Sequence, residues 1–321
     1  MSEGLNWEYE ILKHYHRHGM FGRRGLVSVF LDEINKNTKK KNRLTQQQDF
    51  GLNDNEVVSV LQVGAVAHIM MFIEDLAVIC KAIQSEKIDY YAYLDKKGEE
   101  DLGKVIGEFY ESIIKSSDEE LRKILSYIEI NKFDFENDTH KKLVDSIIKQ
   151  NSEKTRNFFK KVDLFQHNHI GIYRRYKHAG FPILFGLDVP RDDDLYKNYE
   201  FMSVAFTSVE TLTGELASLP FSKKTLESYE NLLKDIFAFL GTIILNKLMC
   251  IERKLDGMLP THLDIFGINL PNDQRQTLEK ILKKFEEKYP QPKRETHLGA
   301  KSNAEYMEWY VNIDKHAESS F

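Results

Sequence analysis

The sequence predicts an all-α protein. Only seven prolines and seventeen glycines punctuate its 321 residues, so long helices have few interruptions. Apolar residues recur at helical spacing over long stretches. A hydrophobic content of 41% and a charged content of 30% fit a folded globular chain rather than a disordered one. We expect a helical bundle with a small irregular or two-stranded insertion and a helical C-terminal extension.

Three segments are expected along the chain. They are N-terminal helices and a basic loop in residues 1–53, a helical core with irregular cover in 54–220, and C-terminal helices packed on that core in 221–321. In the first segment, a helix over 5–18 is expected to end at Gly19, and the glycine-rich turn GMFGRRG leads to a second helix over 26–35. Residues 36–48 carry five basic residues and three glutamines without apolar periodicity, which is typical of a solvated loop.

The core segment should contain two long helices that pack as an antiparallel pair. The first covers 54–85 and is apolar on most sides, and the second begins near Asp138 and can continue without a break to His178. Shorter helices are expected at 99–115 and at 118–127, the latter opened by Ser117 or Asp118. A membrane span is not expected, because the uncharged run in the first long helix is short and contains Gln62 and His68.

The pattern changes after Pro182. Short apolar runs at 183–185 and 201–206 predict the irregular or two-stranded insertion. Ser222 then opens a long helix to about residue 255, which we expect to end at Gly257 and Pro260. The final expected helices cover 271–289 and 304–315.

Composition excludes several classes of function. The net charge of −5 gives no global attraction for nucleic acid, so an anion site must come from local charge. Cys80 and Cys250 lie far apart in apolar runs, as expected of reduced thiols in a cytoplasmic protein. The chain contains no phosphate-binding loop, no dinucleotide fingerprint, no nucleophile elbow and no H-E-x-x-H motif.

The helix that ends near His178 carries the main chemical signal. On a helical projection, one side holds the apolar residues Phe158, Val162, Phe165, Ile172, Tyr173 and Tyr176. Lys160, His167, Arg174 and His178 line the opposite side, at spacings of seven, seven and four. Seven Lys and Arg residues against two acids give residues 153–178 a local net charge of +5. Such a patch can neutralise phosphates, although a solvated basic helix face has the same appearance.

A resemblance adds to this interpretation. The run Tyr173-Arg174-Arg175-Tyr176-Lys177-His178-Ala179-Gly180 resembles the Tyr-Asn-x-x-Lys-His-Gly signature of some HEPN-like helical proteins. That resemblance implies a HEPN-like bundle over residues 54–186, usually dimeric, in a family that includes metal-independent ribonucleases of defence or toxin systems as well as non-catalytic binding modules. The family's catalytic pattern separates Arg from His by four to six residues. Here three residues separate Arg174 from His178 and two separate Arg175 from it, which favours a binding module.

We therefore expect a cytoplasmic, homodimeric module that binds RNA or a protein partner. Lys160, His167, Arg175 and Lys177 would contact the nucleic acid. The alternative is a metal-independent ribonuclease in which Arg174 stabilises phosphate charge and His178 acts as acid or base. A small-molecule pocket between helices is a third interpretation.

Other polar residues have simpler explanations. Glu10, His14 and His18 recur every four residues and resemble a metal-binding face. No cysteine or fourth ligand accompanies them, so we interpret them as a polar helix end and expect no metal and no cofactor. His169 falls on the apolar side, as a hydrogen-bonded core histidine would. His68, Glu74 and Asp75 form a polar cluster that we interpret as a helix surface or a buried pair. The alternative is that an acid of this cluster orients Arg174 or His178, if the two long helices pack together.

Overall fold

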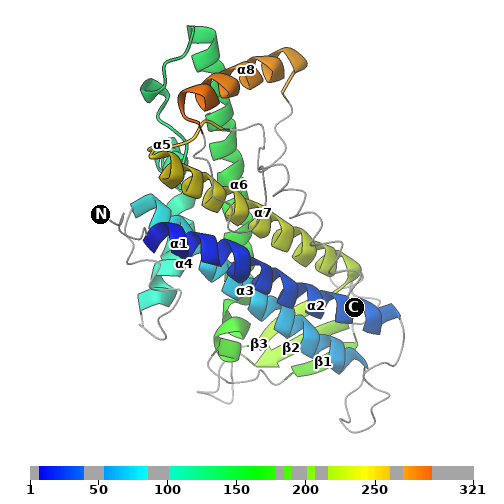
Figure 1. The fold of residues 1–321 in the computed structure, drawn as a ribbon. Helices are drawn as coiled ribbons and strands as arrows, with labels where there is room; N and C mark the ends of the chain where they lie inside the picture. Colours follow the sequence, from blue (N-terminus) through cyan, green and yellow to red (C-terminus); the bar gives the residue numbers. More distant parts are fainter. Residues whose placement is uncertain are drawn as a thin grey trace, which may run out of the picture.

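The computed structural model describes residues 7–39, 54–85, 101–177, 184–188, 201–206, 216–260 and 270–290. These residues are predominantly helical, which confirms the all-α prediction at that level (Figure 1). The predicted C-terminal helix 304–315 and most of the predicted basic loop lie outside the described residues.

Helix α3 (Asp54–Ser85) is the centre of the fold. It contacts the helices α2 (Met20–Lys39), α4 (Asp101–Ile114), α5 (Asp118–Ile124), α6 (Asp138–Lys177) and α7 (Lys223–Arg253) and the strand β1 (Leu184–Asp188). Its apolar residues from Val63 to Ile83 are buried, except for the half-buried Met71. By length and composition it qualifies as a membrane span, but 83% of its most apolar 18-residue window is buried inside the protein. Its hydrophobicity is therefore used for packing against other helices, as expected of a core helix.

The N-terminal helices differ from the prediction. Helix α1 (Trp7–His14) continues through a π-helical turn (Tyr15–Gly19) directly into α2 (Met20–Lys39), so the predicted break at Gly19 and the glycine turn after it are wrong. Gly19 serves instead to let the Tyr15 ring lie against the backbone, since a Cβ there would be 2.5 Å from the ring. The contacts that Tyr15 makes with α3 keep the helix continuous where local propensity favours a stop.

Helices α4 (Asp101–Ile114) and α5 (Asp118–Ile124) are joined by a short turn. Ser117 caps α5 in a capping box with Glu120, which confirms one of the two predicted caps. After α5 the chain pairs with the segment that follows α7, because Ile128 N donates to Met258 O at 2.9 Å and Met258 N donates to Ser126 O at 2.7 Å.

Helix α6 (Asp138–Lys177) is a single helix of 40 residues, or about 60 Å. This confirms that the helix beginning near Asp138 continues to the basic stretch. It packs against α3, as predicted, but crosses it obliquely, so the predicted antiparallel arrangement of the two long helices is wrong (Figure 1). Its two ends approach α8 (Asn272–Lys288) and the strands.

Helix α7 (Lys223–Arg253) begins at its predicted cap, Ser222, and α8 (Asn272–Lys288) follows. The end of α7 differs from the prediction, because Lys254 takes the left-handed closing conformation with φ 54°. Gly257 is required for another reason: a Cβ there would lie 2.5 Å from the Ile128 backbone nitrogen. The close pairing with the segment after α5 therefore needs glycine at this position.

The insertion contains three strands rather than two. Strands β1 (Leu184–Asp188), β2 (Phe201–Phe206) and β3 (Leu216–Phe221) form an antiparallel sheet in that order. The sequence did not indicate β3, because Pro220 interrupts its apolar run. Proline is tolerated at the edge of a sheet, which is where β3 lies.

Candidate nucleic-acid interface on helix α6

The buried face of α6 is the one that its periodicity predicts. Phe158, Val162, Phe165, Ile172 and Tyr173 are buried in the core, and Tyr176 is half-buried. Phe158 and Phe159 pack against Phe239 of α7, with ring centroids 4.9 and 5.3 Å apart. This packing fixes which side of α6 faces outward.

The outward side carries a row of hydrogen-bond donors, here called the outer row: Lys160, His167 and Arg174. All three side chains are exposed, and none forms a hydrogen bond or ion pair with any residue in the described part of the chain. Seven residues of helix separate successive members, about 10 Å along the axis. Leu164, 62% exposed, lies between the first two. Glu153, seven residues before Lys160, lies on the same side of the helix and is also exposed.

Other cations of the basic stretch are already paired. Lys161 Nζ lies 3.8 Å from an Asp235 carboxylate oxygen on α7. Arg156 donates to the Ser116 carbonyl oxygen at 3.1 Å and to Asp118 at 2.5 Å. The unpaired positive charge of residues 153–177 is therefore smaller than the composition indicates. Among the Lys and Arg side chains described there, those without a partner are Lys160 and Arg174, and both belong to the outer row.

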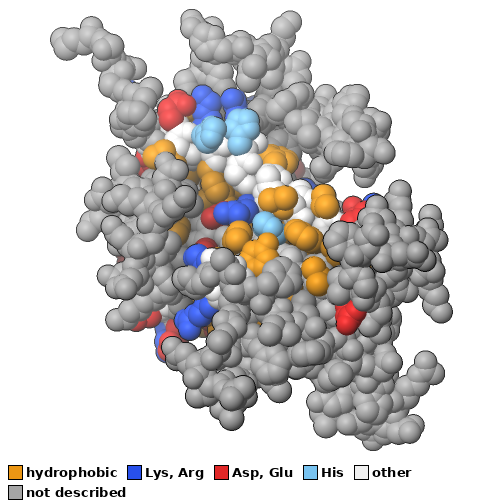
Figure 2. All heavy atoms as spheres, turned by 90° about the horizontal axis from the view of Figure 1, so that it is seen from below, with side chains coloured by type: hydrophobic (Ala, Val, Ile, Leu, Met, Phe, Trp, Pro, Cys, Tyr) orange, Lys and Arg blue, Asp and Glu red, His pale blue; other side chains and the backbone are white. Residues whose placement is uncertain are grey.

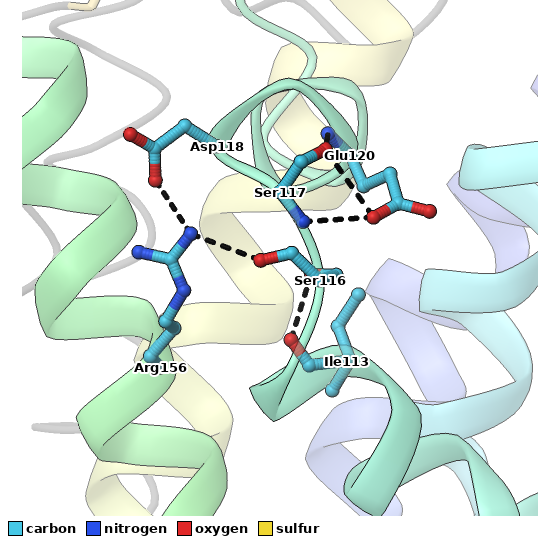
Figure 3. A network of polar contacts seen from close by, with 6 residues as sticks. All are labelled: Ile113, Ser116, Ser117, Asp118, Glu120 and Arg156. Atoms are coloured by element: carbon cyan, nitrogen blue, oxygen red, sulfur yellow. Dashed lines mark hydrogen bonds and ion pairs between the residues drawn. The ribbon is translucent and has the colours of Figure 1, made fainter.

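Figure 3 shows how Arg156 holds the turn between α4 and α5. Ser117 N donates to Glu120 at 2.8 Å, which completes the capping box, and Ser116 Oγ donates to the Ile113 carbonyl oxygen at 2.7 Å. The Arg156 side chain is 25% exposed, and its guanidinium bonds to Ser116 in this turn and to Asp118 at the start of α5. Arg156 thus joins α6 to the start of α5 and has a structural function.

The last described turn of α6 is held to α3 by Glu74. Tyr173 OH donates to Glu74 Oε2 at 2.7 Å, and Lys177 Nζ lies 3.0 Å from both carboxylate oxygens. Burial and the Glu74 carboxylate raise the pKa of Tyr173 well above its usual value, so its hydroxyl remains a donor. The alternative in which an acid here orients Arg174 or His178 is not what the described residues show for Glu74, whose partners are the neighbouring Tyr173 and Lys177.

The adjacent carboxylate, Asp75, binds side chains of the N-terminal helices on the other side of α3. Tyr15 OH donates to Asp75 Oδ2 at 2.7 Å and Arg23 Nε donates to the same oxygen at 3.0 Å. Burial raises the pKa of Asp75 despite the neighbouring guanidinium. Two successive residues of α3 therefore connect it to α6 on one side and to the N-terminal helices on the other.

Two histidines, His68 on α3 and His169 on α6, are packed against aromatic rings. His68 stacks on Phe30 with ring centroids 5.4 Å apart and lies 6.4 Å from Tyr176; burial and nearby Arg23 lower its pKa. His169 bonds to the Phe165 carbonyl oxygen through Nδ1 at 2.7 Å and stacks on the Phe165 ring. This confirms the predicted hydrogen bond, although the side chain is half-buried rather than in the core. Figure 2 shows histidine, basic and acidic side chains beside apolar ones on the face seen from below.

Two predicted site residues are not placed. His178 and the Arg175 side chain lie outside the described residues. Within the described residues, no group of three or more His, Cys, Asp or Glu side chains is arranged to hold a metal ion.

The outer row suits contact with a single-stranded nucleic acid. Lysine and arginine pair with phosphate, and imidazole and guanidinium planes stack on unpaired bases. The exposed Leu164 adds an apolar surface between Lys160 and His167.

Comparison with known proteins gives no relative from which a function can be transferred: no protein-family model, no curated protein and no solved structure matches the chain.

Proposed function

We propose that this protein is a HEPN-like helical module that binds single-stranded RNA through the outer row of α6 without cleaving it. The observation that carries the proposal is the lack of partners for Lys160, His167 and Arg174 among the described residues. Arg156 and Lys161 on the same helix have acidic partners within the fold. Cations left without a carboxylate are those available to phosphate.

The arrangement also supports binding by stacking. His167 and Arg174 are about 10 Å apart on one side of a rigid helix. Two unpaired bases can therefore stack on the imidazole and the guanidinium while Lys160 contacts a phosphate of the RNA backbone. Contacts of this kind discriminate poorly among sequences, and we expect weak sequence preference. The proposal includes the homodimer and the cytoplasmic location expected from the sequence.

A ribonuclease is the second candidate. Glu74 fixes Tyr173 and Lys177, and therefore fixes the turn that also carries Arg174. A guanidinium on an immobilised turn is suited to stabilise charge that develops on a phosphate. In this version His178, one turn further along the sequence, supplies the acid or base. The short separation of Arg174 and His178 favours binding without cleavage.

The test is an affinity series on purified full-length protein with a fluorescent 20-nucleotide single-stranded RNA, measured by anisotropy. The double variant Lys160→Ala/Arg174→Ala should bind about 10-fold or more weakly, since the removal of two cations takes away two phosphate pairings. Lys161→Ala is the matched control, because it removes an adjacent lysine that is paired with Asp235; its affinity should stay within about 2-fold of the wild type.

Equal affinities for the double variant and the wild type, or no measurable binding by the wild type, would overturn the proposal. The same RNA analysed on a denaturing gel distinguishes the two candidates. Cleavage by the wild type that is abolished in His178→Ala, with the RNA still bound, would establish the ribonuclease. Intact RNA in both samples is the result expected of a binding module.

A further inference from the structure

Two exposed histidines lie side by side near the N-terminus, outside the surface discussed so far. The His14 and His18 ring centroids are 4.8 Å apart, with 51° between the ring planes. Both side chains are exposed, and neither ring has a hydrogen-bond partner in the ranges that the structure describes. Figure 2 shows a pair of neighbouring histidine side chains next to basic ones on the face seen from below.

The backbone beneath this pair is an unusual one. His18 lies in the π-helical turn Tyr15–Gly19, and His14 immediately precedes it. A π-turn inside an α-helix is rare and is frequently found at functional sites. Within it, His16 points inward and is buried, so His14 and His18 are the imidazoles that face outward.

Contacts with the core hold this turn in place. The Tyr15 ring lies against Gly19, where a Cβ would come within 2.5 Å of it, and its hydroxyl is bonded to Asp75 on α3. The turn that carries the two outward histidines is therefore held in place by the core in the absence of a ligand. Such preorganisation strengthens binding, because little conformational entropy is lost when the ligand binds.

We propose that His14 and His18 chelate a divalent transition metal of the class that imidazole prefers, such as Zn²⁺, Ni²⁺ or Cu²⁺. Adjacent neutral imidazoles supply two nitrogen ligands. The described residues place no third ligand, so water or an oxygen or nitrogen donor from another molecule fills the remaining positions. Glu10, one turn before His14, lies 3.7 Å from Lys13 and is the nearest carboxylate along the helix.

The test uses tag-free full-length protein and Zn²⁺, with affinity measured by competition against a chromophoric chelator. One Zn²⁺ per chain is expected to bind at this site. His14→Gln and His18→Gln should each weaken it by about 10-fold or more, because loss of even an outer partner of a metal ligand costs about 10- to 100-fold. The double variant should bind more weakly than either single variant, since each single variant keeps one imidazole ligand and the double variant keeps none.

His140→Gln is the control, because it removes a histidine that lies 3.6 Å from Glu136 elsewhere in the fold; its Zn²⁺ affinity should equal that of the wild type. In a parallel Cu²⁺ sample, the electron paramagnetic resonance spectrum should show coupling to two nitrogens in the wild type and to one in each single variant. Wild-type affinity in the double variant overturns the proposal. So does a result in which each single variant keeps half of the bound metal, because that indicates two independent imidazoles.

Discussion

Lys177, on the last described turn of α6, donates hydrogen bonds of 3.0 Å to both carboxylate oxygens of Glu74 on α3. Tyr173, one turn earlier, bonds to the same carboxylate. Residues separated by about a hundred positions thus fix the end of the helix that carries the proposed RNA contacts.

The first prediction concerns the relative importance of these partners. Glu74→Gln should lower the free energy of unfolding by about 1–3 kcal/mol, since a partly buried, charge-assisted bond from Tyr173 is weakened. Lys177→Ala should cost less than about 1 kcal/mol, because its side chain is 43% exposed and exposed ion pairs contribute little. Urea denaturation of both variants measures the difference, and equal losses would contradict it.

A pair of glycines tests the π-turn. Gly19→Ala places a Cβ 2.5 Å from the Tyr15 ring, whereas at Gly22 nothing lies within 4 Å. We expect Gly19→Ala to destabilise the protein by about 1–3 kcal/mol through overpacking. Gly22→Ala should stabilise it by about 0.5–1 kcal/mol, because alanine favours a helix interior. Thermal unfolding of the two variants should shift the midpoint in opposite directions; a stabilising Gly19→Ala would show that the ring does not lie as described.

Buried His16 predicts a pH dependence. Burial, together with Arg17, lowers the pKa of His16 from 6.5 to about 4, so the unfolded chain binds the proton more readily between these values. Stability from this group is therefore complete above pH 6.5 and falls as the pH drops, by about 3 kcal/mol at pH 4 and below. His16→Gln should flatten that part of the stability curve relative to the wild type. Parallel curves for the two proteins would be the contrary result.

Arg156 provides a test of structural against binding function. Arg156→Ala removes bonds to the Ser116 carbonyl oxygen and to Asp118, and should lower stability by about 1–2 kcal/mol. Its RNA affinity should change less than that of Lys160→Ala, because its charge is already paired. Urea denaturation and RNA anisotropy on the same sample measure both effects. If Arg156→Ala lowered the free energy of RNA binding by more than it lowered the free energy of unfolding, Arg156 would belong to the interface.

Periodicity and capping predicted much of the fold. The burial of α3, the unbroken α6 and the cap at Ser117 follow from local signals that survive folding. The continuous N-terminal helix could not be predicted from local signals, because its support comes from the distant bond between Tyr15 and Asp75. Strand β3 was missed since its Pro220 is compatible only with an edge position, and that position depends on the whole sheet.

The candidate site was predictable in part. Helical spacing alone places Lys160, His167 and Arg174 on the side opposite the apolar residues, and the structure leaves them exposed. Helical spacing did not predict which cations are paired. The partners of Arg156, Lys161 and Lys177 come from α5, α7 and α3, and such pairings depend on the packing of helices rather than on local sequence.

The most direct test of the outer row is the salt dependence of RNA affinity. For single strands, each phosphate contact contributes about 0.7 to the slope of log K against log salt concentration. The double variant Lys160→Ala/Arg174→Ala should therefore reduce the magnitude of the wild-type slope by about 1.4, while Lys161→Ala leaves it unchanged. A slope that is the same in the double variant and the wild type would contradict the assignment of α6 as the RNA-binding surface.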